Sequence, residues 1–126
     1  MPQDSSSIGW KLDRDQRRAL LERFPPRYAK AVADHVTFLT KVAPDALLPP
    51  EANAVIVGRA DDDSGVEAMV VAMEGETDRP DGSTWHITWS LDAGRKAVES
   101  NDVIAGRGWT EFSEPVPVRL APARWP

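Results

Sequence analysis

Two long apolar runs in the middle of the chain constrain its fold most strongly. Residues 54 to 60 read AVIVGRA and residues 66 to 74 read VEAMVVAME, and the acidic segment DDDSG separates them. A polar turn between two apolar runs of this length predicts a β-hairpin. Because both faces of each run are apolar, we expect two central strands that are covered on both sides. The aspartates at 61 to 63 lack the spacing of a calcium-binding loop, so we interpret them as the hairpin turn.

Three other segments predict strands. HVTFLT at residues 35 to 40 and TWHITWSL at residues 84 to 91 alternate between two faces, as a half-buried strand does. In the second segment Trp85 and Trp89 share a face with the aliphatic residues, so we expect both indoles in the core. PVPVRLAP at residues 115 to 122 predicts a last strand. Its prolines favour an edge position, because proline cannot donate a hydrogen bond to a neighbouring strand.

Helix signals are clearest near the start of the chain. Asp13 is a suitable N-cap for a helix within residues 12 to 24, and Gln16, three residues later, completes a capping-box pattern. The prolines at 25 and 26 end this helix, because proline cannot continue the backbone hydrogen bonds.

The predicted elements add up to an α+β fold. A second short helix is expected over residues 99 to 105, capped by Ser100 or Asn101. We expect a single domain of about five mostly antiparallel strands, with one or two helices on one face. The length of 126 residues and the hydrophobic content of 41% suit one ordinary globular domain. We place this domain at residues 10 to 126 and expect the polar residues 1 to 9 to form a flexible N-terminus.

Charge and cysteine content limit the partners and the compartment. The formal net charge is −5, which argues against a domain that coats long nucleic acids, because such domains are usually basic. One RNA end or a small anionic ligand in a local pocket remains compatible with this charge. The chain has no cysteine, so disulfides and thiolate metal sites are excluded. Neither a membrane-spanning apolar run nor a secretory signal is visible, so we expect a cytoplasmic protein with no membrane partner.

Both histidines of the chain stand in the same short pattern. His35 and His86 are each followed, after one aliphatic residue, by a threonine, Thr37 and Thr88 respectively. In a strand, residues i and i+2 project from the same face, so each segment presents an imidazole beside a hydroxyl. If the two strands lie close together, one imidazole can take a proton from an attacking water while the other donates one to the leaving oxygen. The threonine hydroxyls can donate to phosphate oxygens, and this chemistry needs no metal or other cofactor.

The paired motifs, HVT at 35 to 37 and HIT at 86 to 88, resemble the HxT/S motifs of the 2H phosphoesterase superfamily. That superfamily includes 2′-5′ RNA ligase-like proteins and the cyclic phosphodiesterase domains of tRNA ligases. The segment SLDAGRKAVESNDVI also resembles the region just after the second motif in tRNA ligase-like members. The resemblance implies a compact member with a 2H-type cleft. It also implies metal-independent hydrolysis or formation of bonds at a 2′,3′-cyclic phosphate, on RNA ends or small nucleotides.

By the same resemblance, His35 and His86 would be the acid–base pair, and Thr37 and Thr88 would bind the phosphate. The pattern leaves open which histidine is the base. Further substrate contacts are possible at Tyr28, which precedes the first motif, and at Arg95 and Lys96, which come after the second strand. For the last two, ordinary surface charge is the competing interpretation.

Two functions of other classes fit the same residues. The first is a nucleotide or RNA-end binding module that keeps the cleft without turnover. The second is a plain α+β interaction domain in which both histidines are structural, and histidines that lie far apart in the fold would favour it.

Overall fold

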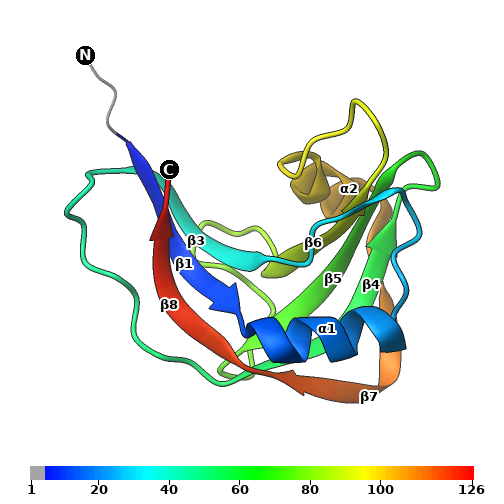
Figure 1. Cartoon of the computed structure of the whole chain (residues 1–126), viewed down its shortest axis with the longest axis horizontal. Coiled ribbons are helices and arrows are strands. Elements are labelled where there is room, and N and C mark those ends of the chain that lie inside the picture. The colour runs from blue at the N-terminus through cyan, green and yellow to red at the C-terminus, as the bar shows by residue number, and fades with distance from the viewer. Residues whose placement is uncertain (1–4) are drawn as a thin grey trace.

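The computed structural model describes residues 5–126 and consists of one curled antiparallel sheet with two helices (Figure 1). The strands and helices, in chain order, are β1 (Ser6–Leu12), α1 (Arg14–Arg23), β2 (Lys30–Ala31), β3 (His35–Val42), β4 (Ala54–Asp61), β5 (Val66–Met73), β6 (His86–Leu91), α2 (Glu99–Arg107), β7 (Thr110–Val118) and β8 (Leu120–Trp125). Among the described residues, no helix has the length and apolar character needed to cross a membrane.

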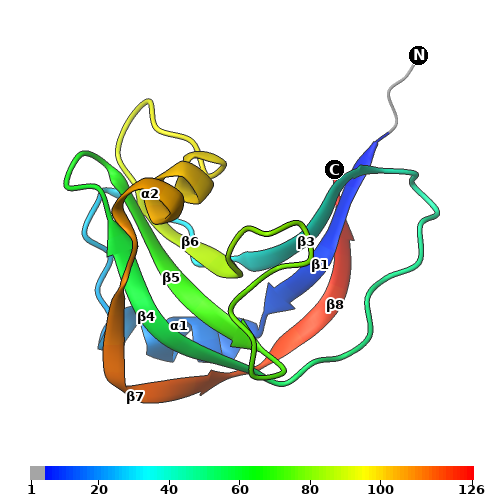
Figure 2. The ribbon, with the colours of Figure 1, turned by 180° about the vertical axis from the view of Figure 1, so that it is seen from behind.

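The order of the strands brings the two ends of the sheet together. The sheet runs β7-β4-β5-β6-β3-β1-β8, and the short β2 pairs with β6. β7 and β8 therefore lie at opposite ends of the order, yet along the chain only Arg119 separates them. The sheet has to curl for this to be possible, and Figures 1 and 2 show β7 and β8 as one bent ribbon that joins its two ends. The proline-containing strand predicted at residues 115 to 122 is thus at an edge, but it is split into two strands at a bend.

The β4–β5 hairpin forms as predicted and supplies the centre of the sheet. Its register runs from Ala54 opposite Met73 to Asp61 opposite Glu67, and every residue of β5 is buried. The turn at 62 to 65 ends at Gly65, whose φ of 119° is a conformation that favours glycine. The continuous apolar character of β5 therefore reflects burial on both faces of the sheet, whereas β4 alternates between buried and half-buried residues, so the expected full cover on both sides holds only for β5.

The two helices cover opposite faces of the sheet, which corrects the expectation of helices on one face. Met69 and Val71 of β5 belong to the main core, which also contains Leu20 of α1. The alternate residues of β5, Ala68 and Val70, belong to a second cluster with Val103 and Ile104 of α2. Because neighbouring residues of a strand point to opposite faces, the two clusters lie on the two sides of β5. Trp85 and Trp89 lie in the main core, as predicted.

Helix α1 begins as predicted but uses its capping residues differently. The Asp13 carboxylate accepts a hydrogen bond from the Gln16 backbone N–H at 2.9 Å, as an N-cap does. The Gln16 side chain does not return to the cap. Its amide donates to the carbonyl of Pro117 at 3.0 Å and accepts from the backbone N–H of Arg119 at 2.5 Å. Gln16 thus fixes the bend between β7 and β8, a role that depends on residues at the other end of the chain.

The sheet has eight strands where the sequence predicted about five. The largest omission is β1, because residues 6 to 9 were assigned to a flexible N-terminus and instead form its first half. Residues 1–4 of that predicted segment lie outside the described residues. Ile8 and Trp10 of β1 are buried, and the strand is paired on both sides, with β3 and with β8. The short polar start SSIG does not carry a strand pattern of its own, so pairing determines its structure.

Candidate active site

The four residues of the two motifs line one cavity of about 420 Å³. Val36 of β3 pairs with Ile87 of β6 in an antiparallel register. The two motifs therefore lie side by side with opposite directions, and their flanking residues project to the face opposite Val36 and Ile87. Both histidines and both threonines lie on that face, one imidazole and one hydroxyl from each strand. The two strands are thus neighbours in the sheet, which is the condition that the two-histidine chemistry requires.

The cavity exists because β3 and β6 separate beyond this pair. Val36 and Ile87 are the pair at which the two strands meet, and β3 continues to Val42 alongside β1. In Figures 1 and 2, β3, β1 and β8 rise on one side and β6, β5 and β4 on the other, with α2 next to the second group. The lining residues come from both sides: Ser7, His35, Thr37, Phe38, Leu39, Thr40 and Trp125 from one, and Arg79, Asp81, His86, Thr88, Ala97, Val98 and Asn101 from the other.

His86 is held in one orientation and is largely buried. Its Nδ1 lies 2.9 Å from the carbonyl oxygen of Thr84, which can only accept a hydrogen bond. Nδ1 therefore carries the proton of the neutral ring, and the lone pair is on Nε2. Burial lowers the pKa of His86, although the hydrogen bond to Thr84 opposes this effect. The positive charge of Arg79 and that of His35 lower the pKa further. His86 is thus neutral at pH 7, which suits a proton acceptor.

His35 has a different partner, the carboxylate of the preceding residue. Its Nδ1 lies 2.9 Å from Oδ2 of Asp34. Asp34 also accepts from Lys11 at 2.5 Å and from Arg14 at 3.1 Å. Although burial disfavours the charged form, hydrogen bonds from Lys11 and His35 hold the pKa of Asp34 well below its usual range. The carboxylate is therefore ionised, and its hydrogen bond with Nδ1 fixes the orientation of the imidazole.

The two threonine hydroxyls differ in their surroundings. Thr88 is buried, and its hydroxyl lies 2.9 Å from the hydroxyl of Ser100 and 3.3 Å from the carbonyl of Ala97. The second contact is long for an O–H···O hydrogen bond, so Thr88 can redirect its proton to a ligand at small cost. The half-buried Thr37 has no hydrogen bond from its hydroxyl within residues 5–126. Both hydroxyls can thus donate into the cavity.

Ser100 and Asn101 are not the cap of α2, which corrects the sequence prediction. The helix begins at Glu99 with Val98 as the flanking residue, and no side chain caps it there. The Glu99 carboxylate instead accepts from the backbone N–H of Lys96 at 2.6 Å. This frees Ser100, which is fully buried, to contact Thr88, and it places Asn101 on the cavity wall. Serine and asparagine at this point in the sequence indicate a helix terminus, but both residues lie within the helix, where Ser100 contacts Thr88 and Asn101 lines the cavity.

Trp125 is a cavity residue that sequence reasoning did not identify. Its ring centroid lies 4.3 Å from that of His35, and Lys11 lies 5.2 Å from the Trp125 ring. The indole crosses β1 at Gly9, where an added Cβ would lie 3.0 Å from Cη2 of Trp125 and 2.1 Å from the carbonyl oxygen of Val36. Glycine at position 9 therefore permits close approach of β3 and of the indole. Trp125 ends β8, and only the closure of the sheet brings it to the first motif.

The mouth of the cavity carries exposed apolar side chains on both sides. Leu39 of β3 is 46% exposed and Val98, just before α2, is 68% exposed. Both line the cavity, as does Trp125. The other exposed lining residues are Thr40 and Asp81, whereas the histidines, the Thr37 and Thr88 side chains and Arg79 are buried or half-buried. The cavity thus combines buried polar groups with an exposed rim that includes apolar side chains, an arrangement that can take a ligand with a charged end and a flat apolar part.

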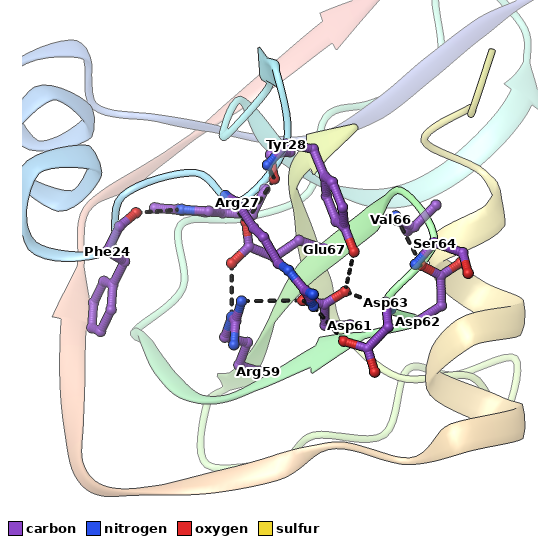
Figure 3. A network of polar contacts seen from close by, with 12 residues as sticks. Phe24, Arg27, Tyr28, Arg59, Asp61, Asp62, Asp63, Ser64, Val66 and Glu67 are labelled. Atoms are coloured by element: carbon purple, nitrogen blue, oxygen red, sulfur yellow. Dashed lines mark hydrogen bonds and ion pairs between the residues drawn. The ribbon is translucent and has the colours of Figure 1, made fainter. Parts of the chain in front are cut away.

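The three further contacts proposed from the sequence do not line this cavity. Tyr28 donates its hydroxyl proton to Asp61 at 2.6 Å, and Figure 3 shows it directed toward the hairpin turn. Arg95 is paired with Asp62 at 2.8 Å and with Glu99 at 3.0 Å. Lys96 is exposed and is not among the lining residues.

The three consecutive aspartates lie at the hairpin turn, with Asp61 as the last residue of β4 and Asp62 and Asp63 in the predicted turn, and each has protein partners (Figure 3). Asp61 binds Tyr28, Arg27 and Arg59. Asp62 accepts from the backbone N–H groups of Ser64 and Val66 at 2.8 and 3.0 Å, and Asp63 pairs with Arg27. Their oxygens therefore stabilise the turn and anchor the segment at 27 and 28 to it.

Comparison with protein-family models, with curated proteins and with solved structures finds no match to this chain. Its function therefore has to be inferred from the geometry and chemistry of the cavity.

Proposed function

We propose that this protein is a metal-independent phosphoesterase of the 2H type that acts on a 2′,3′-cyclic phosphate, at an RNA end or in a small nucleotide. One observation carries the proposal: both histidines and both threonines of the chain's paired motifs line a single cavity of about 420 Å³. A plain interaction domain would have no need to gather them, and the separation of the histidines that would favour such a domain is not present.

The different partners of the two imidazoles support a division of labour. In the proposed step, Nε2 of His86 takes a proton from a water molecule as the water oxygen attacks phosphorus. The bond from phosphorus to one ribose oxygen breaks, and protonated His35 donates a proton to that oxygen. After the step His86 is protonated and His35 is neutral, and exchange with solvent restores both. Two imidazoles thus perform both proton transfers, so the scheme requires no metal ion.

The hydroxyls and the backbone position of the motifs support phosphate binding. Thr37 and Thr88 can each donate one hydrogen bond to a non-bridging oxygen. The Ser100 hydroxyl lies 2.9 Å from the Thr88 hydroxyl and can hold it in position. Donors already directed to the site where negative charge accumulates stabilise the transition state without reorganisation. Each threonine lies next to the histidine of the opposite strand, so the phosphate would sit between the two imidazoles.

The apolar side chains at the rim favour a nucleotide as the substrate over a simple phosphodiester. Leu39, Val98 and Trp125 surround the mouth, where a base and ribose attached to the cyclic phosphate would lie. Bases present a flat apolar face that packs well on aromatic and aliphatic side chains. The local character of this rim agrees with the net charge of −5, because a short substrate needs no extended basic surface.

The test is a product assay in EDTA with the four 2′,3′-cyclic mononucleotides and a short RNA that ends in a cyclic phosphate. We expect ring opening by the native chain, and a loss of about 10²- to 10⁴-fold in rate for either His35→Ala or His86→Ala. Thr37→Val should lower the rate, while Thr110→Val, an exposed threonine outside the cavity, should not. Near-native rates in both histidine variants would exclude the mechanism. Nucleotide binding without product would indicate the binding module instead.

A further inference from the structure

Arg79 is an arginine that lies outside both motifs and yet forms part of the cavity. It belongs to the turn between β5 and β6, in the segment TDRPDGS, which the sequence indicates only as a loop. Its side chain is only 10% exposed. A charged side chain is rarely buried to this extent unless it is paired or used. The turn thus directs a cation into the same space as the two histidines.

The guanidinium of Arg79 connects the two walls of the cavity. Nη1 donates to the carbonyl oxygen of Thr37 at 3.0 Å, and Nη2 donates to Oδ1 of Asn101 at 3.0 Å. Thr37 belongs to the first motif and Asn101 to α2, so one side chain spans the region where β3 and β6 are no longer paired. Nε donates to the hydroxyl of Ser83 at 2.7 Å, which fixes the plane of the guanidinium within its own turn.

These bonds leave part of the donor capacity unused. A guanidinium has five N–H groups, and the contacts to Thr37, Asn101 and Ser83 occupy three of them. Within the described residues, Nη1 and Nη2 each keep one N–H without a protein acceptor. Each of these two N–H groups can donate a charge-assisted hydrogen bond to a phosphate oxygen. The bridging bonds can therefore stay intact while the remaining pair holds an anion.

The charge of Arg79 is only weakly compensated. Asp81 is the one carboxylate among the described lining residues, and its Oδ1 is 3.4 Å from Nε with 63% of its side chain exposed. Asp81 also accepts a hydrogen bond from the backbone N–H of Ser83, so its carboxylate is not committed to Arg79 alone. The imidazole of His35 lies on the opposite side of the cavity, and that of His86 lies on the same side as Arg79. The polar part of the cavity thus has a net positive character when His35 is protonated, and an anion would complete it.

We propose that Arg79 is the main phosphate anchor of this cavity, and that it also fixes the separation between the first motif and α2. This deepens the proposed function and rests on it for the identity of the substrate. The two free N–H groups would hold the non-bridging oxygens between the imidazoles, while the bonds to Thr37 and Asn101 keep both walls in place. Arg79 would then contact the substrate directly and position the Thr37 strand.

The anchor can be tested by binding of inorganic phosphate, without turnover. NMR titration of the full chain should show phosphate moving the signals of both histidines and of the Arg79 Nε–H. Arg79→Met should weaken phosphate binding by about tenfold or more, because charged hydrogen bonds are lost. Arg107→Met, which removes an exposed arginine at the far end of α2, should leave the affinity unchanged. Native affinity in Arg79→Met would overturn the proposal.

The positioning role has its own readout. Arg79→Lys keeps a positive charge but not the planar fork, so it cannot hold Thr37 and Asn101 together. We expect it to lose several-fold in kcat while the pKa of His86 stays lowered, whereas Arg79→Met should raise that pKa toward its ordinary value. The charged groups that face His86 are Arg79 and His35, with Asp81 on the same wall. Native kcat in Arg79→Lys would remove the positioning role.

Two measurements keep the outcomes separate. If Arg79→Met does not fold, the titration of the native chain decides, because an Arg79 Nε–H signal that ignores phosphate while the histidine signals move would overturn the anchor. If the native chain opens no cyclic phosphate but binds inorganic phosphate through Arg79, the proposed function fails and the anchor stands.

Discussion

The molecule contains two dense polar regions that look alike in composition and differ in how their groups are satisfied. The first is the cavity between the two motifs. The second, which we call the carboxylate network, comprises Asp61, Asp62, Asp63 and Glu67 with Arg27, Arg59 and Arg95. Figure 3 labels the members of this network other than Arg95. In the network the carboxylates are bound by arginines, by hydroxyls or by backbone N–H groups. In the cavity, the Thr37 hydroxyl and one N–H group on each of Nη1 and Nη2 of Arg79 have no acceptor among the described residues.

This difference separates a structural cluster from a candidate site. Glu67 is buried and accepts from the Arg27 backbone at 3.0 Å, from Ser90 at 2.6 Å and from Arg59 at 2.7 Å. A network that is satisfied in this way stabilises one conformation and offers nothing to a ligand. Groups that remain partly unsatisfied beside an open cavity are free to bind one. Charge density alone would have favoured the carboxylate network over the cavity as the candidate functional site.

Of the changes considered, removal of the Glu67 side chain should show the largest difference between an effect on stability and an effect on turnover. Glu67→Ala leaves the buried Ser90 hydroxyl and the Arg27 N–H without their acceptor, and these unsatisfied donors should together reduce the free energy of unfolding by about 3 kcal/mol. The Arg59 side chain also loses its acceptor, but it is 37% exposed and can be solvated. Turnover per folded molecule should stay native. His35→Ala should show the opposite: a large loss of turnover with a much smaller change in unfolding free energy.

Urea unfolding and initial rates on the same preparations would check both variants. Glu67→Gln is the matched control, because its amide oxygen can still accept from Arg27 and Ser90, while the charge and the acceptor that face Arg59 are lost. It should be less destabilised than Glu67→Ala. A Glu67 variant that is stable but inactive would show that the network belongs to the functional site, and the distinction between the two regions would fail.

The sequence predicted local features well and long-range ones poorly, and the cavity shows why. The HxT strands, the hairpin and the Asp13 cap depend on periodicity and on near neighbours, and all three are present. Trp125 reaches His35 only because the sheet closes, and Arg79 reaches Thr37 across 42 residues. No short-range pattern encodes such contacts. Ser100 was assigned to the helix cap because serine favours helix ends when no tertiary partner competes for it.

The pH dependence of the unfolding free energy is a smaller effect that distinguishes the cavity from the carboxylate network. Burial lowers the pKa of His86, so the unfolded chain binds more protons than the folded chain below about pH 6.5. The stability contributed by neutral His86 is therefore complete above that pH and is lost as the pH falls toward the folded pKa. The slope for one proton is at most about 1.4 kcal/mol per pH unit.

The network titrates in a lower range. Although burial opposes it, hydrogen bonds from Tyr28 and Arg27 lower the pKa of Asp61, and backbone hydrogen bonds from Ser64 and Val66 lower that of Asp62. Their contribution is present above the ordinary aspartate pKa of about 3.9 and is lost only as the pH falls below it. Urea midpoints from pH 8 to pH 3 should show two separate declines. His86→Gln should lack the upper decline and keep the lower one, and an unchanged upper decline would mean that another group produces it.

The smallest effect concerns Val98, at the rim of the cavity. Val98 is 68% exposed and is the flanking residue before α2, where alanine and valine are similarly poor caps, so alanine there should leave the stability unchanged. If the rim packs against a nucleoside, Val98→Ala should raise KM by about fivefold, equivalent to about 1 kcal/mol of apolar contact. Leu47→Ala is the matched control, because Leu47 is 91% exposed and outside the cavity. Equal KM in both variants would mean that the rim does not contact the base. A rise in KM for Val98→Ala but not for Leu47→Ala would show that the exposed apolar side chain at position 98 serves binding and does not stabilise the fold.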